Sequence, residues 1–124
     1  MTISLDQLEL LVPEPLPDPR ADRVFVKHRR HMHRIYTHRI TYVMAQRAYC
    51  RIYTLDGDYT ISVSLAGLER QLPPCNLFRI HRSYLVNLLH VRLIGKRVVR
   101  VGDRELPLSH GRRAELLARL RTIE

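Results

Sequence analysis

The sequence is poor in the residue types on which several common protein classes depend. Its 124 residues include only two cysteines and five glycines, and tryptophan is absent. Cys50 and Cys75 form a single pair without the spacing of a metal site, and two cysteines do not make a disulfide framework. With so few glycines, no glycine-rich loop that would hold a phosphate occurs. The composition therefore argues against a disulfide-rich scaffold and a nucleotide-binding loop.

Long apolar runs are also lacking. No run approaches the length that a membrane-spanning helix needs. The apolar residues at the N-terminus are interrupted by Asp6, Glu9 and Glu14, so the segment does not resemble a signal peptide. We therefore expect a cytoplasmic protein with no membrane partner and with both thiols reduced.

Acidic residues are scarce, and none occurs between Arg70 and Val101. The formal net charge is +9, from 21 lysines and arginines against 12 acids. Such an excess indicates a polyanionic partner, with nucleic acid ahead of an anionic membrane surface. The alternative is a basic protein whose charge serves no polyanion.

The first 23 residues differ in composition from the rest. Leucines recur at roughly helical spacing within Ser4–Leu11, and prolines then occupy every second position from Pro13 to Pro19. Alternating proline prevents a helix and favours an extended spacer. The sequence thus predicts an N-terminal arm or proline-rich linker at residues 1–23, available to a protein partner, followed by one folded domain at residues 24–124.

The domain reads as a series of short strands separated by turn signals. Asp56-Gly57 is a hairpin signal between two strand-forming runs, and close spacing favours antiparallel pairing. The predicted strands are Val24–Val26, His31–Tyr36, Ile40–Ala45, Tyr49–Thr54, Asp58–Ser62, Phe78–Arg82, Val91–Ile94, Arg97–Val101 and Glu105–Leu108. We expect a mainly β fold, in which antiparallel strands form small sheets beside two short peripheral helices.

The two helices are predicted from leucine spacing and capping residues. Leu65, Leu68 and Leu72 follow Ser64, a favourable N-cap, and precede a pair of prolines. Ser109 is the predicted cap of the last helix, which would bury an apolar side. That side comprises Ala114, Leu116, Leu117, Leu120 and Ile123.

Four of the seven histidines lie close together in the sequence, which raises the question of a metal site. On predicted strands His31 and His33 share a face, whereas His28 does not. No cysteine or carboxylate completes a tetrahedral set with them or with His38. We therefore predict no metal and no cofactor.

The sequence also offers no arrangement typical of an enzyme. Ser83 and Ser109 each have a histidine nearby in the sequence, but such adjacency does not make a catalytic triad. Neither a nucleophile elbow nor a zinc-protease motif occurs. We predict no catalytic residues.

Basic residues instead gather in patches at the ends of predicted elements. An apolar run, Tyr84–Leu89, anchors the chain directly after the patch that ends at Arg82. The patches are Lys27–Arg30, Arg47 with Tyr49, Arg79–Arg82, Lys96-Arg97 and His110–Arg113. Loops held by strands suit side chains that contact phosphates and base edges. A single-stranded RNA module, with Tyr49 and Tyr53 on one sheet face, and a protein-interaction module are the alternatives.

Several motifs resemble the LytTR family of bacterial DNA-binding domains, over about Val24 to Leu120. The most specific is the stretch Phe78–Asn87, FRIHRSYLVN, and Ile40–Val43, Tyr49–Gly57, Ser64–Glu69 and Leu106–Ser109 agree in order and spacing. The resemblance implies loops that enter successive major grooves of duplex DNA, commonly as two protomers on repeated sites. It implies a transcriptional regulator.

Carried over residue by residue, the resemblance places DNA contacts in three loops: Arg47-Ala48-Tyr49, Arg82, and His110–Arg113. We expect Arg47, Arg82 and Arg112 to contact bases, and Lys27, Arg29, Arg79, Lys96 and Arg113 to neutralise phosphates. Tyr49 and His110 complete the predicted interface. Family members often carry Arg directly after the serine that matches Ser109, so here that contact is expected to shift to Arg112 or Arg113.

The second departure concerns domain organisation. Many family members follow a phosphoreceiver domain, for which 124 residues leave no room. The initial Met1 and the arm lead us to expect a stand-alone regulator rather than a fragment.

Overall fold

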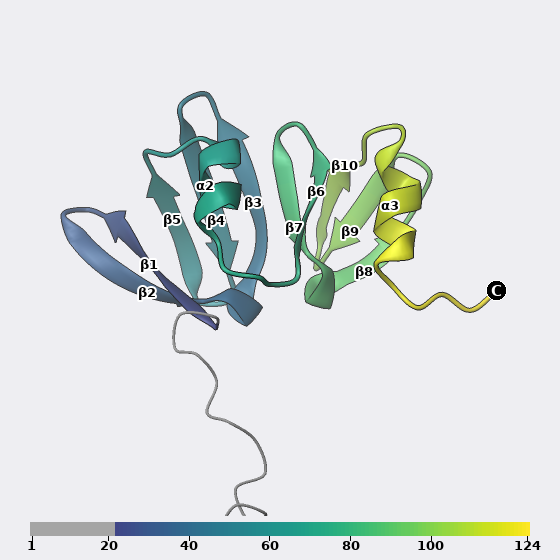
Figure 1. Cartoon of the computed structure of the whole chain (residues 1–124), viewed down its shortest axis with the longest axis horizontal. Helices are drawn as coiled ribbons and strands as arrows, with labels where there is room; N and C mark the ends of the chain where they lie inside the picture. Colours follow the sequence, from purple (N-terminus) through teal and green to yellow (C-terminus); the bar gives the residue numbers. More distant parts are fainter. Residues whose placement is uncertain (1–21) are drawn as a thin grey trace, which may run out of the picture.

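The computed structural model describes residues 22–124, which form ten strands and two short α-helices (Figure 1). The strands are β1 Arg23–His28, β2 His31–Tyr36, β3 Ile40–Gln46, β4 Tyr49–Thr54, β5 Gly57–Ile61, β6 Leu77–His81, β7 Tyr84–Asn87, β8 Val91–Ile94, β9 Val98–Val101 and β10 Arg104–Pro107. The helices are α2 Leu65–Gln71 and α3 Arg112–Ala118, and short 3-10 turns cover Thr37–Arg39 and Leu88–His90. The predicted fold class is confirmed.

All strand pairs are antiparallel, and they form three sheets. The central sheet has the order β5-β4-β3-β7-β6, the C-terminal sheet has the order β10-β9-β8, and β1 pairs with β2 alone. Tight turns fix these registers. The β4–β5 hairpin turns at Leu55-Asp56 and uses Gly57 at φ 141°, a conformation that favours glycine.

The central sheet is covered on both faces, so it divides the interior into two cores. Side chains such as Val43, Ile52 and Leu85 pack toward the β1–β2 hairpin and α2. Others, such as Ile80, Val86 and Leu116, pack toward the C-terminal sheet and α3. Period-two alternation along each strand produces this division. Burial in the first core raises the pKa of the Cys50 thiol, because the charged thiolate is poorly solvated there.

Asn87 is the buried polar residue that ends β7. Its side chain is 1% exposed, and its Nδ2 donates to the carbonyl oxygens of Ile40 at 2.8 Å and Thr37 at 3.2 Å. Its Oδ1 accepts from the Leu89 amide at 2.9 Å. One side chain thereby fixes the ends of β3 and β7 and the 3-10 turn between β2 and β3.

The helix starts confirm one sequence prediction and correct another. Ser64 caps α2, with its Oγ accepting from the Gly67 amide at 3.0 Å. The predicted cap at Ser109 is wrong, because α3 begins at Arg112 with Gly111 as N-cap and no side-chain cap bond. Gly111 adopts φ 92°, which lets the chain turn abruptly before the helix.

The C-terminal helix is also shorter than its leucine spacing suggests. It ends at Ala118, and Ile123 beyond it is 94% exposed instead of buried. No helix within residues 22–124 is long and apolar enough to cross a membrane.

Candidate nucleic-acid interface

Four connections that carry basic residues lie along one edge of the molecule, at the top of Figure 1. They are the β3–β4, β6–β7, β8–β9 and β10–α3 connections, and each carries at least one basic residue. We call this the upper edge. The opposite, lower edge holds the β4–β5 and β9–β10 turns and the two 3-10 turns (Figure 1).

The β3–β4 turn presents Arg47 and Tyr49. Arg47 adopts φ 57° in a two-residue turn with Ala48, which projects its exposed side chain beyond the strands. Tyr49, the first residue of β4, is 49% exposed and pairs across the strands with Gln46. The Ala45 amide donates to the Ser83 carbonyl at 2.8 Å. This bond joins the β3–β4 and β6–β7 turns.

The β6–β7 turn presents Arg82 on a backbone held by Arg79. The guanidinium of Arg79 donates through Nε to the His81 carbonyl at 2.8 Å and through Nη2 to the Arg82 carbonyl. Its Nη1 pairs with Glu69 of α2. The His81 Nδ1 accepts from the Ser83 amide at 3.1 Å. Arg79 is therefore occupied within the fold, whereas the Arg82 side chain is exposed.

The β10–α3 connection brings His110, Arg112 and Arg113 to the same edge, and all three are exposed. The Ser109 amide donates to the Ile80 carbonyl at 2.8 Å, which joins this connection to β6. Arg113 Nε donates to the Gly95 carbonyl at 2.9 Å, beside Lys96 in the β8–β9 turn. Two backbone hydrogen bonds and one donated by the Arg113 side chain thus link the four connections of the upper edge.

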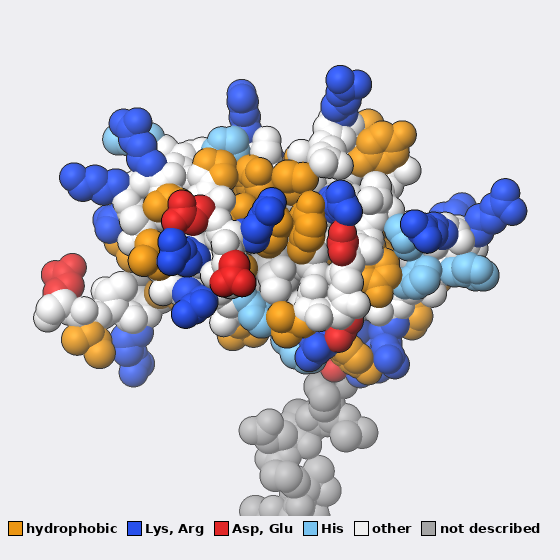
Figure 2. All heavy atoms as spheres, turned by 180° about the vertical axis from the view of Figure 1, so that it is seen from behind, with side chains coloured by type: hydrophobic (Ala, Val, Ile, Leu, Met, Phe, Trp, Pro, Cys, Tyr) orange, Lys and Arg blue, Asp and Glu red, His pale blue; other side chains and the backbone are white. Residues whose placement is uncertain are grey.

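The charges on the upper edge are largely uncompensated. Within residues 22–124, neither Arg47, Arg82 nor Lys96 forms an ion pair, and Arg112 lies 3.3 Å from Glu115. In the view of Figure 2, from behind, lysine and arginine side chains project from this edge. The arrangement suits an extended polyanion that runs along the edge.

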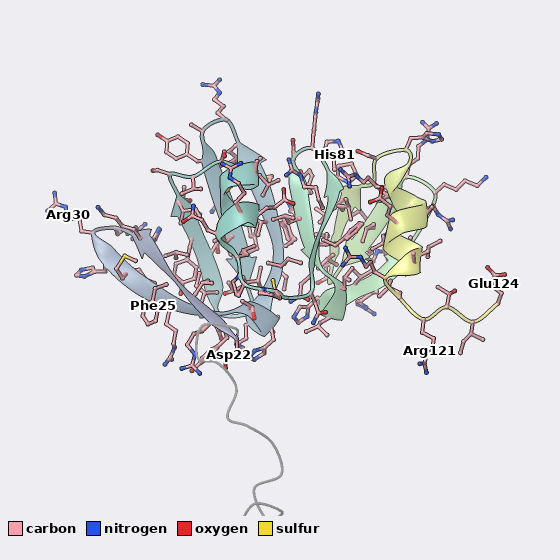
Figure 3. All side chains as sticks on the ribbon, viewed as in Figure 1. Asp22, Phe25, Arg30, His81, Arg121 and Glu124 are labelled. Carbon is pink, nitrogen blue, oxygen red and sulfur yellow. The ribbon has the colours of Figure 1, made fainter. Side chains whose placement is uncertain are left out.

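Two predicted contacts lie elsewhere. Lys27 and Arg29 belong to the β1–β2 hairpin, whose turn residue Arg30 marks the far side of the molecule in Figure 3, apart from His81 at the upper edge. Both are exposed. The structure therefore gathers eight of the ten predicted residues at the upper edge and separates these two.

The histidines of the β1–β2 hairpin are arranged differently from the prediction. Cross-strand register places His28 opposite His31, so His28 shares a face with His31 and His33. The ring centroids of His28 and His33 are 5.5 Å apart, and both rings contact Tyr59. Across residues 22–124, no three histidine, cysteine or acidic side chains are placed to hold a metal ion.

Two structural roles escaped sequence reasoning. The Arg79–Glu69 pair joins residues from a strand and a helix, and only the tertiary fold reveals their proximity. Tyr53, which the single-stranded RNA alternative would use together with Tyr49 on an exposed sheet face, stacks on Tyr42 with ring centroids 4.4 Å apart. The alternation of side chains along a strand predicts which residues share a face, but it does not predict which face another part of the fold covers.

The sequence and the fold both match known proteins. The model of the LytTr DNA-binding domain matches residues 30–121. The CO-responsive transcriptional regulator RcoM of Rhodospirillum rubrum is 43% identical over 58 residues, which are 47% of this chain and 25% of that protein. The sensory transduction protein LytT of Bacillus subtilis is 33% identical over 55 residues, which are 44% of this chain and 23% of that protein.

These stretches mean that the chain spans about a quarter of the length of the curated relatives it matches. Among solved structures, a LytTr DNA-binding domain from Bacillus cereus has a TM-score of 0.63 with 20% identity. The match covers 77% of this chain and 96% of that domain, so the two share a fold. Because the family model covers most of the folded residues, including every connection of the upper edge, this chain belongs to the LytTr DNA-binding domain family.

Proposed function

We propose that this protein binds double-stranded DNA in a sequence-specific manner through its upper edge and acts as a bacterial transcriptional regulator. The observation that carries the proposal is the presence of exposed, unpaired arginines on rigidly joined turns. Arg47 and Arg82 meet this description within residues 22–124, and their turns are joined by the Ala45–Ser83 hydrogen bond. An arginine held in this way can donate two hydrogen bonds to a guanine edge in the major groove.

We propose the role of each residue from the exposure of its side chain and from whether that side chain forms an ion pair. Arg47, Arg82 and Arg112 contact bases, with Arg112 released from its 3.3 Å contact with Glu115 when DNA binds. Lys96 and Arg113 neutralise phosphates beside the β8–β9 turn, and Tyr49 and His110 add hydrogen bonds to the backbone or bases. We assign no catalytic role to any residue.

Arg79 receives a different role from the phosphate contact predicted from the sequence. Its side chain is 21% exposed, and its three donor positions are engaged by Glu69 and by two carbonyl groups of the β6–β7 turn. We propose that Arg79 positions Arg82. A turn that is already ordered loses less conformational entropy when DNA binds, so the base contact made by Arg82 contributes more to the affinity.

The charges on the hairpin, Lys27 and Arg29, are proposed to act only at long range. Their separation from the upper edge leaves them outside a duplex that runs along the four connections (Figure 3). Electrostatic attraction of this kind raises the association rate and weakens with salt.

The organisation around this interface is also proposed. Residues 24–124 would be the DNA-binding domain and residues 1–23 an arm, although β1 already begins at Arg23. One protomer would occupy each of two repeated sites on the DNA. A chromosomal target would place the protein in the bacterial cytoplasm.

A selection experiment tests the proposal. The protein is titrated with a pool of random duplexes at two salt concentrations, and the retained DNA is sequenced. We expect enrichment of a repeated motif and a non-specific background that fades as salt rises. Salt-sensitive binding without enrichment would contradict sequence-specific recognition.

Single-stranded RNA is the weaker candidate. Recognition of unpaired bases needs exposed aromatic rings, and Tyr53 is stacked on Tyr42 instead of being available. Tighter binding of unpaired RNA than of the selected duplex would overturn the duplex proposal.

A further inference from the structure

Strand β1 has one free edge. It pairs only with β2, and a groove of about 750 Å³ runs beside it, lined by β1, the end of β5 and α2. Free edges expose unpaired backbone groups, which proteins usually cover. Within residues 22–124 no strand covers this one.

The register of the hairpin identifies which backbone groups face the groove. The Thr37 amide donates to the Asp22 carbonyl at 2.9 Å, so Asp22 belongs to the set of residues that bond toward β2. Because backbone groups alternate in direction along a strand, those of Val24, Val26 and His28 also bond to β2. The backbone groups of Arg23, Phe25 and Lys27 therefore point to the free edge. The Phe25 side chain is 58% exposed, unusual for such an apolar residue.

The charge of the groove is one-sided. Its lining includes Lys27, His28, Arg29 and Arg30 but no acid. Neither Lys27, Arg29 nor Arg30 forms an ion pair within the described part of the chain. Its apolar lining includes Ile61, Val63, Leu68 and Leu72. The occupant it suits is an extended segment with acidic and apolar side chains.

The sequence directly before β1 has these properties. Between Pro13 and Pro19, every second residue is proline, and the residues in between are Glu14, Leu16 and Asp18. In an extended strand, alternate residues direct their backbone groups to opposite sides. Such a segment keeps amide donors on one side only, so it can add to a sheet edge but offers no edge for a further strand.

We propose that residues 14–18 add to the free edge of β1 as a third, antiparallel strand of the β1–β2 sheet. A four-residue loop at residues 19–22 places Asp18 opposite Arg23, Leu16 opposite Phe25, and Glu14 opposite Lys27. Glu14 then lies beside Lys27, which has no ion pair within residues 22–124, and Leu16 lies beside the exposed Phe25. Asp18 adds a second carboxylate beside Arg23, which already pairs with Asp22 at 2.7 Å. The arm also covers Phe25 and compensates Lys27, which removes that residue from any phosphate contact.

Amide hydrogen exchange in the full-length chain tests this strand, and it does so independently of DNA binding. The edge amides of Phe25 and Lys27 are compared with that of Asp58, which lies on the outward side of β5, an edge strand of the central sheet. We expect Phe25 and Lys27 to exchange at least tenfold more slowly than their intrinsic rates, and Asp58 to show no such protection. Intrinsic exchange at Phe25 and Lys27 would overturn the proposal.

Matched variants identify what provides the protection. Leu16→Pro removes the amide opposite Phe25 and should restore fast exchange there, whereas Leu11→Pro, outside the paired segment, should not. Glu14→Lys should weaken the protection, and adding Lys27→Glu should recover it. Protection that survives Leu16→Pro, or that depends on protein concentration, would show that a second copy or another contact covers β1 and would refute the arm as its occupant.

Discussion

The two ends of the strands differ in whether their basic residues are paired with acids, although both consist largely of short turns between antiparallel strands. The upper edge presents Arg47, Arg82 and Lys96, which have no ion pair within residues 22–124. The lower edge carries Asp56 and Asp103 in its two hairpin turns. Arg39 there is neutralised by Asp56 at 2.5 Å. The comparison separates basic residues that maintain the fold from basic residues left available to a partner.

The two edges also differ in what holds them. Buried Asn87 fixes the lower ends of β3 and β7, whereas half-buried Arg79 fixes the turn at the upper edge. Damage at the lower edge should therefore appear as lost stability. Damage at the upper edge should appear as lost recognition.

The largest expected effect is that of Asn87→Ala. The substitution leaves the Thr37 and Ile40 carbonyls and the Leu89 amide without the hydrogen bonds that Asn87 provides. We expect the free energy of unfolding to fall by roughly 3 kcal/mol, since each buried polar group left without a hydrogen bond costs about 1–3 kcal/mol. Denaturant unfolding measures this loss. Asn76→Ala, at an exposed asparagine, is the control, and an equal loss there would refute the role assigned to Asn87.

The next effect is that of Arg82→Ala on DNA binding. Loss of a bidentate base contact should cost about 1–3 kcal/mol on the selected duplex and far less on a scrambled one, with unfolding unchanged. Anisotropy titrations on both duplexes measure the difference. Arg121→Ala removes the same charge at an exposed position away from the upper edge (Figure 3). Equal losses on both duplexes for Arg82→Ala would remove its role as a base contact.

A smaller loss of selectivity is expected for Arg79→Lys. Lysine keeps the charge but cannot reproduce the donors that join Glu69 to the His81 and Arg82 carbonyls. Selectivity should fall by about 0.5–1.5 kcal/mol, the worth of a typical hydrogen bond. The slope of binding against salt should not change.

Combining Arg79→Lys with Arg82→Ala tests whether the two residues act together. The double variant should lose little beyond Arg82→Ala alone, because coupled residues are not additive. Arg70→Lys, at an exposed arginine of α2, serves as the control. Fully additive losses would show that Arg79 acts on DNA by itself.

Lys96→Ala should weaken both duplexes alike. One lost phosphate contact lowers the slope of log affinity against log salt by about 0.9. Lys27→Ala removes an equal charge from the separate hairpin and should leave the slope nearly unchanged. If Lys96→Ala and Lys27→Ala lowered the slope of log affinity against log salt equally, the claim that DNA contacts the upper edge and not the β1–β2 hairpin would be contradicted.

The smallest effect concerns acid pH at the lower edge. The hydrogen bond from Arg39 lowers the pKa of Asp56, so this pair stabilises the fold above the ordinary aspartate range and is lost as pH falls through the lowered pKa. Arg39→Gln should move the pKa of Asp56 back toward its usual value. An NMR titration of the Asp56 carboxyl checks this, and an unchanged midpoint would contradict it.

Local signals predicted much of this fold. Strand and hairpin positions followed from turn residues such as Asp56-Gly57, and the cap at Ser64 followed from its place before a leucine repeat. The Ser109 cap was wrong because Gly111 adopts a left-handed conformation and takes that position. The prediction for Ile123 failed because leucine spacing cannot tell where a helix leaves the core.

The candidate site was predictable only in part, for a physical reason. Arginines at strand ends could be picked out singly, but whether each is free or paired depends on partners distant in the sequence. Arg79 and Arg82 are neighbours in one motif, yet the first lies against Glu69 and the second is exposed. The face shared by His28 and His31 likewise depends on cross-strand register.

The most direct measurement is an amide chemical-shift map of the chain titrated with its selected duplex. The upper edge should respond at residues 47–49, 81–83 and 109–113, while the lower edge around Asp56 and Asp103 should not. Shifts concentrated at the lower edge or at the β1–β2 hairpin, with the upper edge silent, would contradict the assignment of the DNA interface.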